Sequence, residues 1–163
     1  MKDVYVTKEK ELQLVVFAVN DNEYAISILS VREIINVPQI VALPNMPSSV
    51  VGVINLRGSV IPVVDLGEEF GINACEGEDS TRKILIVEMK DQMVGYLVDN
   101  VTEVLTVNKD CLEKPASSLD STGMGLVDYI CNLTDRLIPV VDLSKLLTSN
   151  ESVKLHEILS QVR

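Results

Sequence analysis

Residues 54–70, INLRGSVIPVVDLGEEF, and residues 131–147, CNLTDRLIPVVDLSKLL, are two copies of one motif. The second copy lies 77 positions after the first, and eight of the seventeen residues are identical. A match of this length indicates that one structural unit has been duplicated. The shared IPVVDL core is rich in β-branched residues, which favour strands because their stiff side chains fit a pleated surface.

A weaker repeat lies upstream of each copy. Residues 14–35 align with residues 84–105, 70 positions later, with apolar positions that follow each other almost throughout. The two matches together predict duplicated units of about residues 12–75 and 82–148, within a single domain of residues 12–150. The difference between the two offsets predicts a longer connection in the second unit, in the polar residues 109–124. Three residues are identical in the weaker repeat: Asp21/Asp91, Val31/Val101 and Glu33/Glu103.

The first unit predicts a series of short strands. Residues 12–19 and 24–28 form a hairpin around a polar turn, and residues 31–37 follow as a further strand. Residues 53–56 and 60–66 flank a three-residue turn, Arg57-Gly58-Ser59, whose glycine accepts positive φ. Pro62 and its counterpart Pro139 lack an N–H group, so we expect them at a sheet edge or at a bulge.

Short strands repeated twice, without helices between them, predict a mainly β fold with two small closed barrels of about five strands. Two pairings remain open. In one, each barrel combines the two halves of one unit; in the other, the barrels are intertwined, so that the second half of the first unit joins the first half of the second. Residues 150–163 predict an amphipathic helix, because Leu155, Ile158, Leu159 and Val162 form one apolar stripe.

Composition narrows the class of partner. The formal net charge of −10 disfavours nucleic acid and anionic membrane surfaces. Three widely spaced cysteines, Cys75, Cys111 and Cys131, indicate neither a disulfide framework nor a zinc site. The N-terminus has no apolar signal core, and no apolar run approaches the ~20 residues of a membrane helix. We therefore expect a cytoplasmic protein without a metal or cofactor.

Catalytic groups are scarce. His156 is the only histidine, which leaves little scope for a nucleophile–base pair. Asp65 and Asp142 occupy equivalent positions and admit two interpretations, the paired carboxylates of a small hydrolase or caps on the turns after the IPVVDL strands. The cap is favoured, because nothing brings the two units' carboxylates together, so we expect no catalytic residue. Arg57 has Thr134 as its counterpart, which indicates either a task specific to the first unit or an ordinary solvated turn residue.

The segment Gly52–Gly58, GVINLRG, followed by VIPVVDL at 60–66, resembles the CheW family. The sequences EYAI at 23–26 and VREII at 31–35 fit the same pattern. The resemblance covers about residues 12 to 150 and includes the duplication. It implies two five-stranded barrels of SH3-like shape and a role as a non-enzymatic adaptor of bacterial chemotaxis.

By the same resemblance, the partners are the regulatory domain of the histidine kinase CheA and the cytoplasmic tip of a methyl-accepting chemoreceptor. The chain would then act as a scaffold in a two-component system, or as an equivalent adaptor in a non-flagellar receptor–kinase array. The family pattern implies an assembly role for Arg57 and Glu33, which we expect to pair beside the groove between the barrels. Val31 would add an apolar contact there, and Asn55 and Gly58 belong to the same turn. Glu103 is the counterpart of Glu33, but Thr134 stands in place of Arg57 in the second unit, so we expect Glu103 to lack an arginine partner. The remaining motif residues, Gly52, Pro62, Asp65, Pro139 and Asp142, are expected to have structural roles.

Overall fold

The computed structural model describes residues 10–71, 80–89, 91–115 and 126–145. The helix predicted at 150–163, with its apolar stripe and His156, lies outside these residues, as do Cys75 and most of the predicted long connection. Four short helical elements are described: η1 (Ile28–Ser30), α2 (Leu66–Glu69), η2 (Lys109–Cys111) and η3 (Leu143–Lys145). The strands are β1 (Glu11–Val19), β2 (Asn22–Ser27), β3 (Val31–Asn36), β4 (Val50–Leu56), β5 (Ser59–Asp65), β6 (Lys83–Met89), β7 (Gln92–Val98), β8 (Asn100–Asn108), β9 (Leu112–Glu113), β10 (Val127–Leu133) and β11 (Arg136–Val141).

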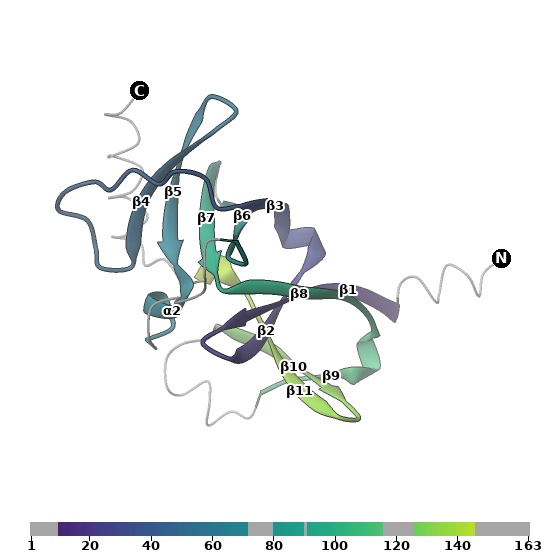
Figure 1. Cartoon of the computed structure of the whole chain (residues 1–163). Coiled ribbons are helices and arrows are strands. Elements are labelled where there is room, and N and C mark those ends of the chain that lie inside the picture. Colours follow the sequence, from purple (N-terminus) through teal and green to yellow (C-terminus); the bar gives the residue numbers. More distant parts are fainter. Residues whose placement is uncertain (1–9, 72–79, 90, 116–125, 146–163) are drawn as a thin grey trace.

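The strands form two sheets, and each sheet takes strands from both duplicated units. Sheet A has the order β8-β1-β2-β11-β10-β9, and sheet B has the order β3-β6-β7-β5-β4. Hairpin β4–β5 therefore lies beside hairpin β6–β7, while hairpins β1–β2 and β10–β11, from the two ends of the chain, meet in sheet A (Figure 1). This order corresponds to the intertwined pairing.

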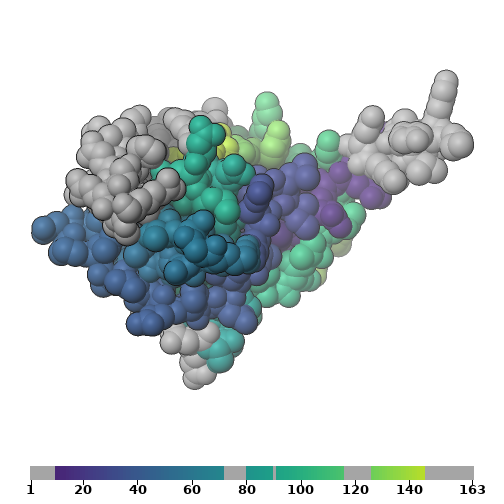
Figure 2. Space-filling view, turned by 90° about the horizontal axis from the view of Figure 1, so that it is seen from above, coloured from purple at the N-terminus to yellow at the C-terminus, as the bar shows by residue number. Residues whose placement is uncertain are grey.

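The third strand of each unit is exchanged between the sheets. Strand β3 follows the first hairpin of sheet A but pairs with β6 in sheet B. Strand β8 follows hairpin β6–β7 of sheet B but pairs with β1 in sheet A. In Figure 2 the blue strands of sheet B accordingly gather on one side, and the purple and green strands of sheet A on the other. The short links between these strands hold the sheets together at their boundary.

Both sheets curl, although the strand pairings of the described residues close neither into a barrel. The edge strands of sheet A, β8 and β9, are joined by the three-residue turn η2, so the sheet must curve until its two edges meet at that turn. In sheet B the edge strands β3 and β4 are also consecutive in the chain. The expected mainly β fold with two similar subdomains is confirmed, while the described pairings form curled open sheets of six and five strands.

Three apolar clusters explain the near-continuous apolar runs of the sequence. Alternate side chains of a strand point to opposite faces, so a run such as residues 14–17 serves two cores. One cluster lies between the sheets, and each sheet also encloses a cluster of its own. Fully buried members of the shared cluster are Val15, Phe17, Val19, Val64, Leu66, Leu85, Tyr96 and Val98; those of sheet A are Leu14, Val16, Ala25, Cys131 and Ile138; those of sheet B are Val63, Ile84, Ile86 and Leu97.

A buried hydrogen bond adds direction to the contact between the sheets. Tyr96 of β7 is fully buried, and its hydroxyl donates to the carbonyl oxygen of Leu143, 3.1 Å away, just after the last strand of sheet A. Apolar packing alone is non-directional, whereas a buried hydrogen bond specifies one arrangement. The bond therefore helps to hold η3 against sheet B.

The turn between β4 and β5 is tighter than predicted. Leu56 pairs with Ser59, so the loop between β4 and β5 contains two residues, Arg57 and Gly58, rather than three. Both residues have positive φ, 50° and 89°. Two successive positive φ values give the turn a backbone twist that matches the twist of the strands in a hairpin with a two-residue loop.

The prolines of the repeat lie on interior strands and not at an edge, but each of these strands pairs with its hairpin partner across a bulge, which was the other alternative expected. Pro62 is on β5, between β4 and β7, and Pro139 is on β11, between β10 and β2. Each stands one residue before its strand begins to pair in parallel, at Val63 and Val140. A missing N–H group is tolerated there because that ladder has not yet begun.

Gly52 has a packing reason to be glycine. A Cβ at this position would lie 2.7 Å from the carbonyl carbon of Val41, which bridges to Val53 of β4, and its φ is 156°. We expect Gly52→Ala to lower the free energy of unfolding by about 2–3 kcal/mol, because backbone must move to admit the methyl group. Urea denaturation measures the change.

Gly58→Ala is the matched control for this prediction. A Cβ at Gly58 meets nothing within 4 Å, so only its positive φ opposes alanine, at a cost of about 1 kcal/mol. Equal losses in the two variants would contradict the role of the close backbone approach.

Candidate functional site

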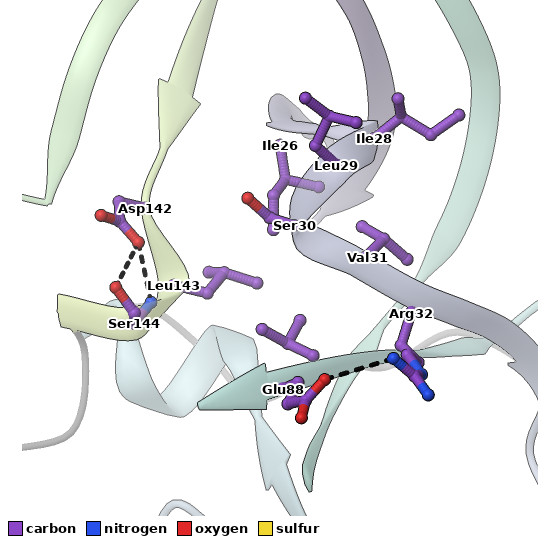
Figure 3. A pocket seen from close by; sticks show the side chains of 11 residues that line it. Ile26, Ile28, Leu29, Ser30, Val31, Arg32, Glu88, Asp142, Leu143 and Ser144 are labelled. Atoms are coloured by element: carbon purple, nitrogen blue, oxygen red, sulfur yellow. Dashed lines mark hydrogen bonds and ion pairs between the residues drawn. The ribbon is translucent and has the colours of Figure 1, made fainter. Parts of the chain in front are cut away.

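A groove runs along the boundary between the two sheets (Figure 3). Its volume is about 750 Å³. One wall is formed by β2, η1 and the start of β3, with β6 paired beside β3, and the other by the residues that follow β11. Its apolar lining is Ile26, Ile28, Leu29, Val31, Val87 and Leu143. A groove lined by both apolar and polar side chains is the kind of surface that receives a segment of another protein.

Leu29 is the most exposed large apolar side chain of the described residues, at 88%. It lies in the turn η1, where the Ser27 hydroxyl accepts a hydrogen bond from the Leu29 backbone N–H at 3.3 Å. A second hollow of about 420 Å³ lies on its other side, lined also by the start of β1 and by Thr106. Leu29 therefore projects between two hollows, at a cost in exposed apolar area that folding alone does not require.

The groove has charged and polar groups at its margin. Arg32 and Glu88 face each other across β3 and β6, with a guanidinium–carboxylate distance of 3.3 Å. On the opposite wall the Asp142 carboxylate accepts hydrogen bonds from the backbone N–H and hydroxyl of Ser144, at 3.0 and 2.5 Å. These groups give the groove a polar rim (Figure 3).

The predicted ion pair between Arg57 and Glu33 is present. The two terminal guanidinium nitrogens of Arg57 donate to the two carboxylate oxygens of Glu33 in a bidentate arrangement. The bond from Nη1 to Oε1 measures 2.9 Å. Glu33 follows Val31 on β3, but a bulge separates the two, and neither Glu33 nor Arg57 lines the groove. The pair thus lies outside the lining of the groove, with the Arg57 side chain 68% exposed.

The rest of the NLRG motif holds this arginine in place. The side-chain oxygen of Asn55 accepts a hydrogen bond of 2.8 Å from the backbone N–H of Gly58. Gly58 supplies the second positive φ of the turn, and Arg57 itself is held at φ 50°. Since a non-glycine residue at positive φ is uncommon, the turn fixes the direction in which the arginine leaves the sheet.

The ion pair changes the titration of its members. The hydrogen bond from Arg57, helped by its charge, holds the pKa of Glu33 below its ordinary value despite some desolvation, and it raises the pKa of Arg57. A lowered folded-state pKa contributes stability that is present above the ordinary pKa of glutamate and is lost as pH falls through the lowered value. The pair therefore stays formed into mildly acidic solution.

We expect Arg57→Met to raise the pKa of Glu33 into the ordinary glutamate range, because the donor that favours the carboxylate is removed. NMR titration of the Glu33 side-chain carboxyl carbon measures this pKa. Arg32→Met, which removes the partner of Glu88 instead, is the control and should leave the pKa of Glu33 unchanged. An unchanged Glu33 pKa in Arg57→Met would show that the ion pair does not persist in solution.

Sheet A contains a second arginine–glutamate cluster, which corrects the expectation that Glu103 has no arginine partner. Arg136 pairs with Glu103 and also lies 3.2 Å from Glu23. The hydrogen bond to Glu103 is the main cause that raises the pKa of Arg136. The alignment placed Thr134 opposite Arg57, but the arginine of this unit stands two residues later, on the first position of β11.

The repeated aspartates are engaged in local backbone capping. The Asp65 carboxylate, nearly buried, accepts a hydrogen bond of 3.1 Å from the Glu68 N–H and caps α2. Asp142 caps the turn at Ser144 in the same way. Asp65 ends a strand of sheet B and Asp142 follows a strand of sheet A. The structure thus gives each a capping geometry and no shared site.

No helix of the described residues is both long and apolar enough to cross a membrane. Within the same ranges, no three histidine, cysteine, aspartate or glutamate side chains gather as metal ligands would. The candidate site is composed of the groove, Leu29 and the Arg57–Glu33 pair.

Comparison with known proteins shows the family to which the chain belongs. Residues 13–154 match the model of the CheW-like domain. The chain belongs to the CheW-like domain family. Chemotaxis protein CheW from Rhizobium meliloti is 33% identical over 140 residues, which cover 85% of this chain and 89% of that protein. Chemotaxis protein CheW from Bacillus subtilis is 32% identical over 140 residues, 86% of this chain and 89% of that protein.

A solved structure of the CheW family has the same fold. The scaffolding protein TtCheW from Thermoanaerobacter tengcongensis superimposes with a TM-score of 0.75 at 32% identity, covering 86% of this chain and 90% of that one. The CheW family, together with this scaffold structure, identifies the chain as a chemotaxis coupling adaptor.

Several residues described above could not be recognised as site residues from the sequence. Leu29 lies in the run AISILSV, where an apolar residue between two strands is typical of a core position. Arg32 and Glu88 come from different units, and no motif links them. Arg136 could have been found by searching one or two positions beyond the aligned turn.

Proposed function

We propose that the chain works through its surfaces alone, as an adaptor that binds the regulatory domain of the kinase CheA and the cytoplasmic tip of a chemoreceptor at the same time. The observation that carries this proposal is a groove of mixed apolar and polar lining with a projecting leucine, together with a bidentate ion pair whose arginine is mostly exposed. The described carboxylates of the repeated motif are occupied in caps, which supports a role without chemistry.

The groove suits a helical partner. A helix presents apolar side chains at positions i, i+3, i+4 and i+7, and such a row fits an apolar groove with a polar rim. The charged pairs at the margin would then set orientation more than affinity, because exposed ion pairs contribute little stability. We assign the groove, with Val31 and Leu29, to the receptor tip.

The Arg57–Glu33 pair supports assembly from outside the lining of the groove. The ion pair and the tight turn hold the guanidinium group in one orientation, and one face of it remains accessible to a partner. An arginine held in place in advance loses less conformational entropy when it binds. We assign this exposed face to the contact that completes the ternary complex.

An adaptor of this kind needs no chemistry of its own. Occupation of two sites raises the effective concentration of kinase at the receptor. A receptor signal reaches the kinase only if the docked surfaces bind its two states with different affinities. The mechanism thus consists of linked binding equilibria.

Pairwise and three-component binding tests this function. Purified chain is mixed with tagged CheA regulatory domain, with a receptor-tip fragment, and with both, and the complexes are separated by size-exclusion chromatography. We expect the chain to bind each partner and to bring the two into one peak. Binding to neither partner would contradict the proposal and leave only the fold in common with the family.

A further inference from the structure

Two cysteines of sheet A lie in one apolar cluster. Cys131 on β10 is fully buried, and Cys111, the last residue of η2, is half-buried and packs against the same cluster. Both are free thiols. The strand register pairs Cys131 with Leu112, the residue directly after Cys111.

This register sets the backbone distance between the two cysteines. Facing residues of an antiparallel pair have Cα atoms about 4.5–5.5 Å apart, and consecutive Cα atoms lie about 3.8 Å apart. The Cα atoms of Cys111 and Cys131 are therefore separated by roughly 6–7 Å, a distance near the upper end of the range that disulfides span. Since Cys111 ends a 3-10 turn, it does not follow the alternation of a strand, and its side chain packs on the cluster that contains Cys131.

The two thiols differ in burial, and this difference predicts the order in which they react. Burial, with a smaller contribution from Cys111, raises the pKa of the Cys131 thiol and keeps it protonated. Cys111 is the more accessible sulfur, in a turn whose other two residues, Lys109 and Asp110, are exposed. Disulfide exchange begins at an accessible thiolate, so Cys111 is the first to react.

We propose that Cys111 and Cys131 form a reversible thiol–disulfide pair, a modification site on sheet A, with a low-molecular-weight disulfide as the oxidant. The Cys111 thiolate attacks the oxidant, forms a mixed disulfide and releases one reduced thiol. Cys131 then gives up its proton to solvent and attacks the Cys111 sulfur, which releases the second reduced thiol. The protein loses two protons and two electrons, and the oxidant takes them up and is reduced to two thiols.

A disulfide between Cys111 and Cys131 would restrain turn η2 and the edge of sheet A that follows it. Turn η2 joins the two edge strands of the sheet, β8 and β9, and a disulfide from its last residue to β10 would fix β9 in register. A cross-link that the native fold accommodates also stabilises the fold, because it restricts the unfolded chain. Oxidation is thus expected to stiffen sheet A while leaving the groove open.

The test compares the full chain when folded and when unfolded in urea, in buffers of reduced and oxidised glutathione at a series of ratios. Trapped thiols are counted, and peptide mapping by mass spectrometry identifies the pairs, including any that involve Cys75. We expect a Cys111–Cys131 cross-link whose equilibrium constant in the folded chain exceeds that in urea by about tenfold or more, and a melting temperature raised by about 5 °C or more.

Single variants separate the roles of the two sulfurs. Cys131→Ser should leave Cys111 as a mixed disulfide with glutathione, whereas Cys111→Ser should leave the buried Cys131 unmodified in the folded chain. An equilibrium constant no higher in the folded chain than in urea would overturn the proposal, as would cross-links only between chains. The outcome is independent of partner binding, so it does not depend on the adaptor function.

Discussion

Arg57→Glu is expected to weaken assembly of the ternary complex about tenfold or more while leaving the melting temperature nearly unchanged. The side chain is mostly exposed, so its loss removes little packing. Glutamate has no branched Cβ, so it meets the same backbone constraint at φ 50° as arginine does. Reversal of charge at an interface, by contrast, replaces an attraction with a repulsion.

Co-sedimentation of the kinase with receptor-tip assemblies at increasing chain concentration measures the effect, and thermal unfolding is recorded on the same samples. Lys109→Glu, an exposed charge reversal on η2 of sheet A, is the matched control and should assemble normally.

A second variant, Glu33→Arg with Arg57→Glu, restores an ion pair with its charges exchanged. We expect it to remain defective, because the partner contacts the exposed cation of the turn. A parallel loss of folding in Arg57→Glu would contradict the account, and full rescue by the exchanged pair would show that the pair acts only within the chain.

Leu29→Asp is expected to reduce affinity for the receptor tip about thirtyfold or more. Leu29 projects between two hollows and is almost wholly exposed, so a partner that fills the groove must bury it. An aspartate there would place an unpaired charge in a newly desolvated contact, which is costly. Stability should change by less than about 0.5 kcal/mol, since the side chain contributes little to the core.

Leu137→Asp provides the matched control. Leu137 is 64% exposed on β11 and does not line either hollow. Isothermal titration calorimetry with a receptor-tip fragment compares the two variants with wild type. The account predicts a loss confined to Leu29→Asp. Equal affinities for Leu29→Asp and wild type would remove the groove from the receptor contact.

The sequence predicted the strands from local patterns, and it predicted the main ion pair through the resemblance to the CheW family. The hairpin of β1 and β2, the repeated hairpins and the mainly β class follow from alternation, turn residues and duplication. Arg57 and Glu33 were linked by a long motif that resembles the CheW family. The pairing of units into sheets was left open, because a strand's own residues do not specify which of two similar partners it meets.

What could not be predicted depends on three-dimensional neighbours. The groove exists because two sheets meet, and the apolar Leu29 has the same sequence signature as a buried residue. Pro62 was expected at an edge or at a bulge; the bulge is present in the β4–β5 pair, but the start of a parallel ladder beside Pro62 cannot be read from one strand. Arg136 was missed because the second turn had diverged, and the compensating arginine stands on the strand after it.

The most direct test of the adaptor mechanism is the amount of kinase carried down with receptor-tip assemblies as the chain is titrated from zero to a large excess. A bridge with two independent sites first joins its partners and then, in excess, occupies them separately. The account predicts that kinase recovery rises from background, passes through a maximum and falls again. Recovery that is independent of the chain, or that shows no rise at any concentration, would contradict the claim that this protein couples receptor to kinase.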